Sequence, residues 1–158
     1  KNVFMSDAGY SGEGFIWKRD LDGFFNNVDR QLVMESLKGV AKWDKEIIGG
    51  NYDGHHGGGK ACRVDRFPSV PDHPILKGLK FPFATPASLY RNSPLPHSST
   101  PLLNGSVKGF PSEPVAWINQ TTFKGKVFYT SLGHIEDFTN PAFNQLLIGA
   151  INWCLEKE

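Results

Sequence analysis

The prediction of the fold starts from VFYTSLGHIEDF, residues 127–138. The first half of this stretch alternates β-branched and aromatic residues between two sides, which is typical of a strand. Both sides are largely apolar, as expected for a strand that is covered on both faces. A glycine, a histidine and two acids follow (Gly133, His134, Glu136 and Asp137). We therefore expect ionisable groups at the carboxyl end of a buried strand.

The segment that follows predicts the clearest helix of the chain, over residues 140–157. Asn140 is a favourable N-cap and Pro141 suits the first helical position. Apolar residues recur at helical spacing and predict one buried stripe, formed by Phe143, Leu146, Leu147, Ala150, Ile151 and Cys154. A strand, a short loop and a helix form an α/β unit, and open α/β sheets bind ligands at the carboxyl ends of their strands. This places His134 at a candidate site.

Other strands are expected upstream of this unit. Residues 114–119 and 126–132 are separated by a short segment with Gly125 as the turn residue, which predicts a hairpin. Shorter strands are expected at residues 61–67 and around Leu102–Leu103.

Glycine and proline organise the remaining segments. Residues 49–59, GGNYDGHHGGG, hold six glycines in eleven positions, which predicts an ordered loop with positive φ angles or close backbone approach. Most of the 11 prolines fall within residues 68–114, so extended pieces and turns are expected there. Residues 1–6 are expected to form a strand, and residues 28–38 a helix that Gly39 ends.

The composition excludes several classes of protein. The chain has 158 residues, enough for one compact domain with a core, and 39% hydrophobic and 21% charged residues. The net charge is +1 and the sequence contains no run of basic residues, so it does not predict a surface that binds nucleic acid. No apolar run approaches the roughly 20 residues that span a membrane. Because residue 1 is Lys rather than Met, we expect a processed or truncated chain. We expect a soluble protein, and the sequence does not distinguish a cytoplasmic protein from an exported one.

Six motifs, taken in order, resemble the ThuA-like or trehalose-utilisation family. They are GGNYDGHH (49–56), DHPILKGL (72–79), SLYRNSPL (88–95), EPVAWIN (113–119), GKVFYTSLGHIEDFTNPAF (125–143) and LLIGAINW (146–153). The resemblance covers about residues 43–155. We therefore treat residues 1–158 as a single ThuA-like domain in which residues 1–42 diverge from the family pattern.

The resemblance implies a fold and a field of activity. The implied fold is that of class I glutamine amidotransferases, an α/β, flavodoxin-like three-layer sandwich with a mainly parallel sheet, and a shortening at its N-terminal side is left open. The implied activity is the catabolism of trehalose and related or oxidised sugars, without a dependable amidotransferase triad. In agreement, Cys62 is expected in a short strand and Cys154 on the buried stripe of the last helix.

We predict a protein that acts on a disaccharide or keto-sugar by histidine-assisted proton transfer or hydrolysis, as a hydrolase or isomerase. His134 is predicted to move the proton, since histidine titrates near neutrality, and Asp137 or Glu136 to orient it. Two of these residues have a structural alternative. His134 can bond the backbone of its loop, and Asp137 can brace the turn before the last helix.

The predicted substrate-binding residues lie in two loops, with His55 and His56 in the first and Tyr90, Arg91 and Asn92 in the second. Arg91 suits a carboxylate or hydroxyl-rich substrate, and its alternative is a salt bridge that braces the loop. The expected partner is a small carbohydrate rather than nucleic acid or membrane, and homo-oligomerisation is left open.

Two further hypotheses stay open. One histidine of the 55–56 pair, His134 and a carboxylate would suit zinc or iron, but the spacing matches no regular ligand motif. The metal ligands are thus undefined, and no cofactor is predicted beyond an open question of a divalent metal. The second hypothesis is a non-catalytic sugar-binding or assembly module on the same fold. The catalytic prediction requires His134 and the 55–56 pair to meet at one edge of a parallel sheet.

Overall fold

The computed structural model describes residues 10–11, 14–15, 44–56, 61–70, 72–121 and 124–156 of the chain. The elements in chain order are β1 (Tyr10–Ser11), β2 (Gly14–Phe15), the π-helical turn η1 (Asp44–Ile48), β3 (His55–His56), β4 (Cys62–Arg66), the 3-10 turn η2 (Pro74–Leu76), β5 (Phe83–Thr85), β6 (Leu89–Tyr90), β7 (Thr100–Ser106), β8 (Glu113–Gln120), β9 (Lys126–Thr130), the 3-10 turn η3 (Ile135–Thr139) and α3 (Pro141–Leu155). The predicted strand at 1–6 and helix at 28–38 lie outside the described residues.

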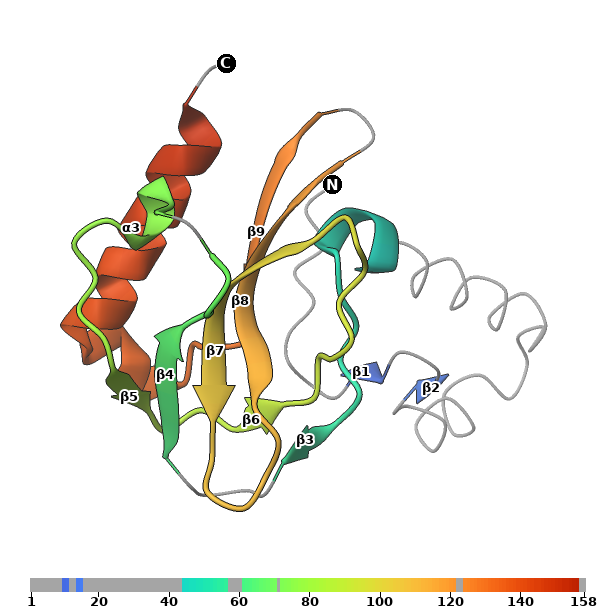
Figure 1. Cartoon of the computed structure of the whole chain (residues 1–158), viewed down its shortest axis with the longest axis vertical. Coiled ribbons are helices and arrows are strands. Elements are labelled where there is room, and N and C mark those ends of the chain that lie inside the picture. Colours follow the sequence, from blue (N-terminus) through green and yellow to red (C-terminus); the bar gives the residue numbers. More distant parts are fainter. Residues whose placement is uncertain are drawn as a thin grey trace, which may run out of the picture.

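The main sheet has five strands in the order β5-β4-β7-β8-β9, and every neighbouring pair is antiparallel. Figure 1 shows this sheet twisted and curled, with α3 along one side. The prediction of a mainly parallel, flavodoxin-like sandwich is therefore wrong. Only residues 107–112 connect β7 to β8 and only residues 121–125 connect β8 to β9. Parallel neighbours need a crossover of about a dozen residues or more, so these connections allow hairpins alone.

The strand at the centre of the sequence argument, β9, lies at one edge of this sheet rather than inside it. Each of its residues is half-buried. Its apolar character on both faces has two separate causes, because Phe128 packs against the core while Tyr129 stacks on Trp117 with ring centroids 4.0 Å apart. The carboxyl end of β9 is consequently not the crevice of a parallel sheet, and the rule that placed a site at His134 does not apply.

Local predictions agree with the structure where short-range chemistry governs. The hairpin of β8 and β9, the strands β4 and β7, and the last helix are all present. Asn140 caps α3 as expected, with its side-chain oxygen accepting a hydrogen bond from the Ala142 N–H at 3.0 Å. Gly49 and Gly54 have φ values of +83° and +80°, as the glycine-rich loop predicts.

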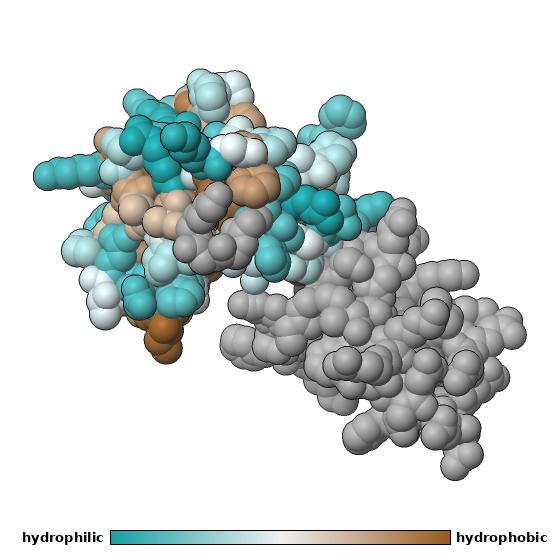
Figure 2. Space-filling model, turned by 90° about the horizontal axis from the view of Figure 1, so that it is seen from below, coloured by the Kyte–Doolittle hydropathy of each residue, from teal (hydrophilic) through white to brown (hydrophobic). Residues whose placement is uncertain are grey.

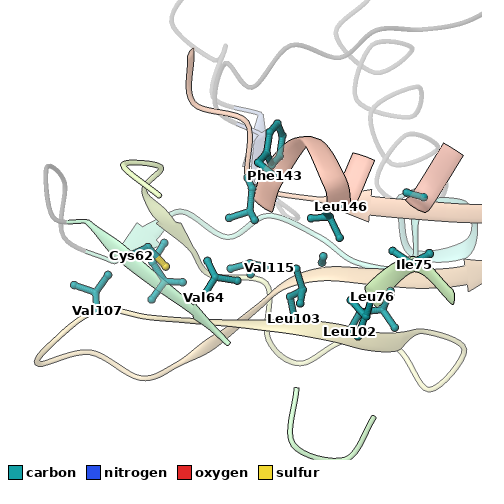
Figure 3. Packing of buried hydrophobic residues seen from close by; sticks show 14 residues of the cluster. Cys62, Val64, Ile75, Leu76, Leu102, Leu103, Val107, Val115, Phe143 and Leu146 are labelled. Carbon is teal, nitrogen blue, oxygen red and sulfur yellow. The ribbon is translucent and has the colours of Figure 1, made fainter. Parts of the chain in front are cut away.

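The core lies between the sheet and the elements η2 and α3. Figure 3 shows Leu146 projecting from α3 toward Val115 and Leu103, with Phe143 near the start of the helix and Ile75 of η2 at the other end of the cluster. Cys62 is buried in this core as expected, and burial raises the pKa of its thiol.

The predicted buried stripe of α3 needs one correction. Ile151 and Cys154 are both exposed, because the contact with the core follows Phe143, Leu146 and Ala150 instead. The structure therefore leaves part of the expected stripe on the outer side of the helix.

The other side of β8 is covered by η1 and the glycines that follow it. The Trp117 indole N–H donates to the Ile48 carbonyl at 2.8 Å, and the Asn119 amide donates to the Ile47 carbonyl at 2.8 Å. A Cβ on Gly50 would lie 2.6 Å from the Trp117 ring, so glycine is required for this approach. These contacts fix the start of the loop that leads to β3.

We predict that Gly149→Ala destabilises the protein, although alanine favours helices. A Cβ at position 149 would lie 2.6 Å from the Ile75 carbonyl oxygen. The clash should cost about 1–3 kcal/mol, more than the roughly 0.5–1 kcal/mol that Gly→Ala gains in an open helix. Urea unfolding measures the difference. Asn152→Ala, on the exposed side of the same helix, is the control and should lose nothing; an unchanged or higher stability of Gly149→Ala would contradict the packing described.

Candidate functional site

The two predicted substrate-binding loops lie side by side. Strands β3 and β6 form an antiparallel ribbon in which His55 pairs with Tyr90 and His56 with Leu89. Beyond the strands, the Arg91 N–H donates to the Gly54 carbonyl and the Asp53 N–H to the Arg91 carbonyl, both at 2.9 Å. Figure 1 shows the ribbon beside the end of the sheet where β7 turns into β8, and Figure 2, viewed from below, shows this end with polar residues around a smaller apolar area.

The ribbon directs its two histidines to opposite sides. Successive residues of a strand alternate between faces, and opposed residues of an antiparallel pair share a face. His56 thus lies on the side of the buried Leu89, while His55 is exposed on the side of Tyr90. The structure thus places the two histidines in different surroundings, which the sequence could not distinguish.

His56 forms the central contact of the site with Glu113, the first residue of β8. The Nε2 atom of His56 lies 2.8 Å from Oε1 of Glu113, whose residue is 5% exposed. The other carboxylate oxygen, Oε2, accepts the backbone N–H groups of Asn92 at 3.1 Å and Ser93 at 2.9 Å. One buried carboxylate therefore holds both the histidine of β3 and the loop after β6.

The surroundings of Glu113 act on its pKa in opposite directions. Burial raises the pKa of this carboxyl, whereas the hydrogen bonds from His56, Ser93 and Asn92 lower it, and the net pKa lies below the ordinary value of 4.5. Glu113 is thus a carboxylate at neutral pH. When the imidazole is neutral, a carboxylate at Nε2 requires the proton on Nε2, which leaves the lone pair on Nδ1.

The ring of His56 is held from a second direction by Phe110, from the turn between β7 and β8. The two ring centroids are 5.5 Å apart. Among the described residues, no hydrogen bond engages the Nδ1 atom of His56. A carboxylate on one nitrogen, a packed ring and a lone pair on the other nitrogen are the arrangement of an oriented general base.

The remaining predicted binding residues lie in the same ribbon or directly after it. Tyr90 lies against Tyr52, with ring centroids 4.6 Å apart. Arg91 donates from Nε to the Asp53 carbonyl, and its Nη2 lies 3.5 Å from the Asp53 carboxylate. Asn92 is 2% exposed and donates from Nδ2 to the Pro114 carbonyl at 3.0 Å. The contacts of Arg91 are those of the loop-bracing alternative considered from the sequence.

His134, Glu136 and Asp137 lie in a different setting, the turn that joins β9 to α3. Asp137 is 1% exposed, and its Oδ2 accepts the Thr85 hydroxyl at 2.8 Å and the backbone N–H groups of Gly133 and His134, each at 3.0 Å. The His134 ring is exposed, and its Nδ1 accepts the Glu136 N–H at 3.3 Å. Asp137 thus bonds the backbone of His134 and not its imidazole.

These contacts make the turn a reciprocal N-terminal cap of η3. Within the described part of the chain, every hydrogen bond of His134 is made inside its own turn, and none reaches His55 or His56. Among the described residues, no hydrogen bond joins the predicted catalytic histidine to the predicted binding pair. A catalytic role for His134, Glu136 or Asp137 stays a prediction.

A comparison with models of protein families gives a match that spans most of the chain. Residues 34–154 match the model of the trehalose utilisation family, ThuA. The chain belongs to the ThuA family. A search of curated proteins finds no match. The family assignment made from the motifs is therefore confirmed, and it assigns the protein to trehalose utilisation without naming a substrate or a reaction.

Both halves of the His56–Glu113 pair lie within the part of the chain that matches ThuA. Glu113 is not among the residues predicted from the sequence, because EPVAWIN indicates only a strand. The available signal was an acidic residue immediately before an apolar run, because a carboxylate at the start of a buried strand requires donors around it.

Two further properties of this ThuA-family chain bear on its function. Over the described ranges, no group of three or more His, Cys, Asp or Glu side chains is placed to hold a metal ion, so the zinc or iron arrangement considered above does not occur there. No helix within those ranges is long and apolar enough to cross a membrane.

We predict that Glu113→Gln makes the free energy of unfolding less dependent on pH under acidic conditions. Because the folded pKa of Glu113 is depressed, its carboxylate stabilises the fold at pH values above about 4.5, and this contribution is lost as pH falls through the folded pKa. The substitution should remove about 1–3 kcal/mol near neutral pH and weaken the pH dependence below about 4.5. Urea unfolding between acidic and neutral pH measures both quantities.

The control is Glu136→Gln, at an exposed acid, which should change stability by less than about 0.5 kcal/mol. An acid profile of Glu113→Gln that coincides with that of the unmodified protein would show that Glu113 is not held as described.

Proposed function

We propose that this ThuA-family protein acts on a disaccharide or keto-sugar at the β3–β6 ribbon, with His56 as the proton-transferring residue and Glu113 as the residue that orients it. The observation that carries the proposal is the 2.8 Å contact between His56 Nε2 and the buried, ionised Glu113. Membership of the trehalose utilisation family supports carbohydrate as the substrate class.

For a keto-sugar, the chemistry follows from the position of the lone pair. Nδ1 of His56 removes the proton from the carbon beside the carbonyl, the C–H electron pair moves into the carbon–carbon bond, and the carbonyl oxygen becomes an enolate oxygen. The imidazolium formed is stabilised by the Glu113 carboxylate, as an oriented base requires. In an isomerisation, the hydroxyl on the deprotonated carbon gives its proton to the enolate oxygen, and the imidazolium returns the C–H proton to the former carbonyl carbon. In a cleavage, the enolate re-forms the carbonyl and the glycosidic oxygen leaves the next carbon with the imidazolium proton, which gives an enone and a free sugar.

In this proposal the reacting carbon of the sugar lies on the inner side of the ribbon, beside His56, and a more distant part of the sugar reaches the exposed outer side. His55 is exposed there, and the neighbouring Tyr90 and Arg91 offer an aromatic face and a guanidinium group. Aromatic rings and a few polar groups are the usual lining of a carbohydrate site. Asn92 is proposed to act indirectly, because its backbone N–H holds Glu113 in place.

A second candidate function is a sugar-binding module without turnover. It is favoured by the extent to which the side chains of Arg91 and Asn92 already contact the protein, Arg91 with Asp53 and Asn92 with Pro114. Side chains that brace their own loop shape a binding surface without taking part in chemistry.

An experiment in D₂O distinguishes the enzyme from the sugar-binding module, because only the enzyme exchanges a proton of the sugar. With a keto derivative of trehalose, the enzyme should exchange the proton beside the carbonyl for deuterium, as measured by NMR. His56→Gln should slow this exchange by about 10²–10⁴-fold while the sugar still binds, because general base catalysis contributes about that factor. Trehalose itself, which has no carbonyl, tests direct hydrolysis in the same samples.

The control is His134→Gln. The His134→Gln variant should retain deuterium exchange. If exchange is lost in His134→Gln and kept in His56→Gln, the proton-transferring residue is His134, as predicted from the sequence, and not His56. Binding without exchange or cleavage by the unmodified protein would support the binding module.

A further inference from the structure

Helix α3 carries apolar side chains on two sides, and only one side contacts the core. Phe143, Leu146 and Ala150 are buried against the sheet. On the outer side Ile148, Ile151 and Leu155 are 54%, 57% and 74% exposed. A helix at the surface of a protein normally presents polar residues to water, and a helix that is apolar all round is normally covered.

The exposed residues form a continuous stripe. Asn144, Ile148, Ile151 and Leu155 follow one another at steps of four, three and four residues. This is the spacing of the seam along which two helices of a coiled coil meet, and a single polar Asn is common in such seams. The Asn144 amide donates to the Phe138 carbonyl at 3.1 Å, and Phe138, 57% exposed, extends the stripe beyond the helix. We call Phe138, Asn144, Ile148, Ile151 and Leu155 the outer seam.

The absence of charged residues from α3 limits the kinds of partner that its outer seam can bind. Residues 141–155, PAFNQLLIGAINWCL, contain no Asp, Glu, Lys or Arg. An acidic or basic partner would therefore find no complementary charge along the helix. A second copy of the same helix brings no like charges together and offers aliphatic side chains at the same spacing, so the outer seam is complementary to itself across a two-fold axis.

We propose that the outer seam is the contact of a homodimer in which α3 packs antiparallel to α3 of a second copy. The helix of 15 residues is about 22 Å long, so a contact made by this helix alone is small. The dimer is accordingly a weak, concentration-dependent one. The inference rests on the helix surface and is independent of the sugar chemistry proposed for His56.

Sedimentation velocity of the full chain at increasing concentration tests the proposal. The unmodified protein should shift from monomer to dimer, and Ile151→Lys should weaken the association by at least about tenfold, because it places two ammonium groups at a desolvated two-fold contact. Ser98→Lys adds the same charge at an exposed loop residue and should leave association unchanged. Circular dichroism confirms that the variants are folded.

Three results would overturn the proposal. The first is an unmodified protein that stays monomeric at every concentration, and the second is an Ile151→Lys variant that associates as the unmodified protein does. The third is hydrogen exchange showing that residues 148–155 of the monomer are covered by another segment of the same chain. Protection that appears only as the dimer forms would support it.

Discussion

Glu113 enters β8 with 5% of its surface exposed, and a carboxylate at that depth is stable only when donors surround it. The structure provides them from two separate segments, His56 of β3 and the backbone of Asn92 and Ser93 after β6. The same carboxylate therefore ties two loops to the sheet and fixes the plane and the tautomer of an imidazole. Removing that charge would loosen the ribbon and release the histidine together, so stability and the proposed chemistry depend on one residue.

The antiparallel sheet changes where a site is to be expected. In a parallel sheet all the carboxyl ends of the strands meet at one edge, which is why the sequence argument favoured His134 at the end of β9. Here β9 is an edge strand and its end leads into a capped turn held by Asp137. The polar groups that do converge come from the ribbon and from the first residue of β8, which lies at the end of the sheet where β7 turns back.

The sequence was informative where neighbours along the chain determine structure. Asn140 and Pro141 specified the start of α3, and Gly125 marked the turn between β8 and β9. It also grouped the segments around His56 and Tyr90 as predicted binding loops, and the structure shows that these segments pair as strands. The orientation of the sheet was mispredicted, because the implied family fold outweighed the short connections that exclude parallel strands. Glu113 was missed because its partners, His56 and Asn92, lie 57 and 21 residues away, and no local pattern encodes such contacts.

Membership of the trehalose utilisation family and the geometry of the ribbon together favour a sugar site built on an oriented histidine. The claim on which this account depends is that the Glu113 carboxylate holds the proton of His56 on Nε2. Nitrogen-15 NMR of the histidine rings, recorded at a pH at which His56 is neutral, distinguishes the tautomers directly. The account predicts that His56 is fixed with its proton on Nε2 and that Glu113→Gln releases this preference. A ring with its proton on Nδ1, or one that samples both tautomers in the unmodified protein, would contradict it.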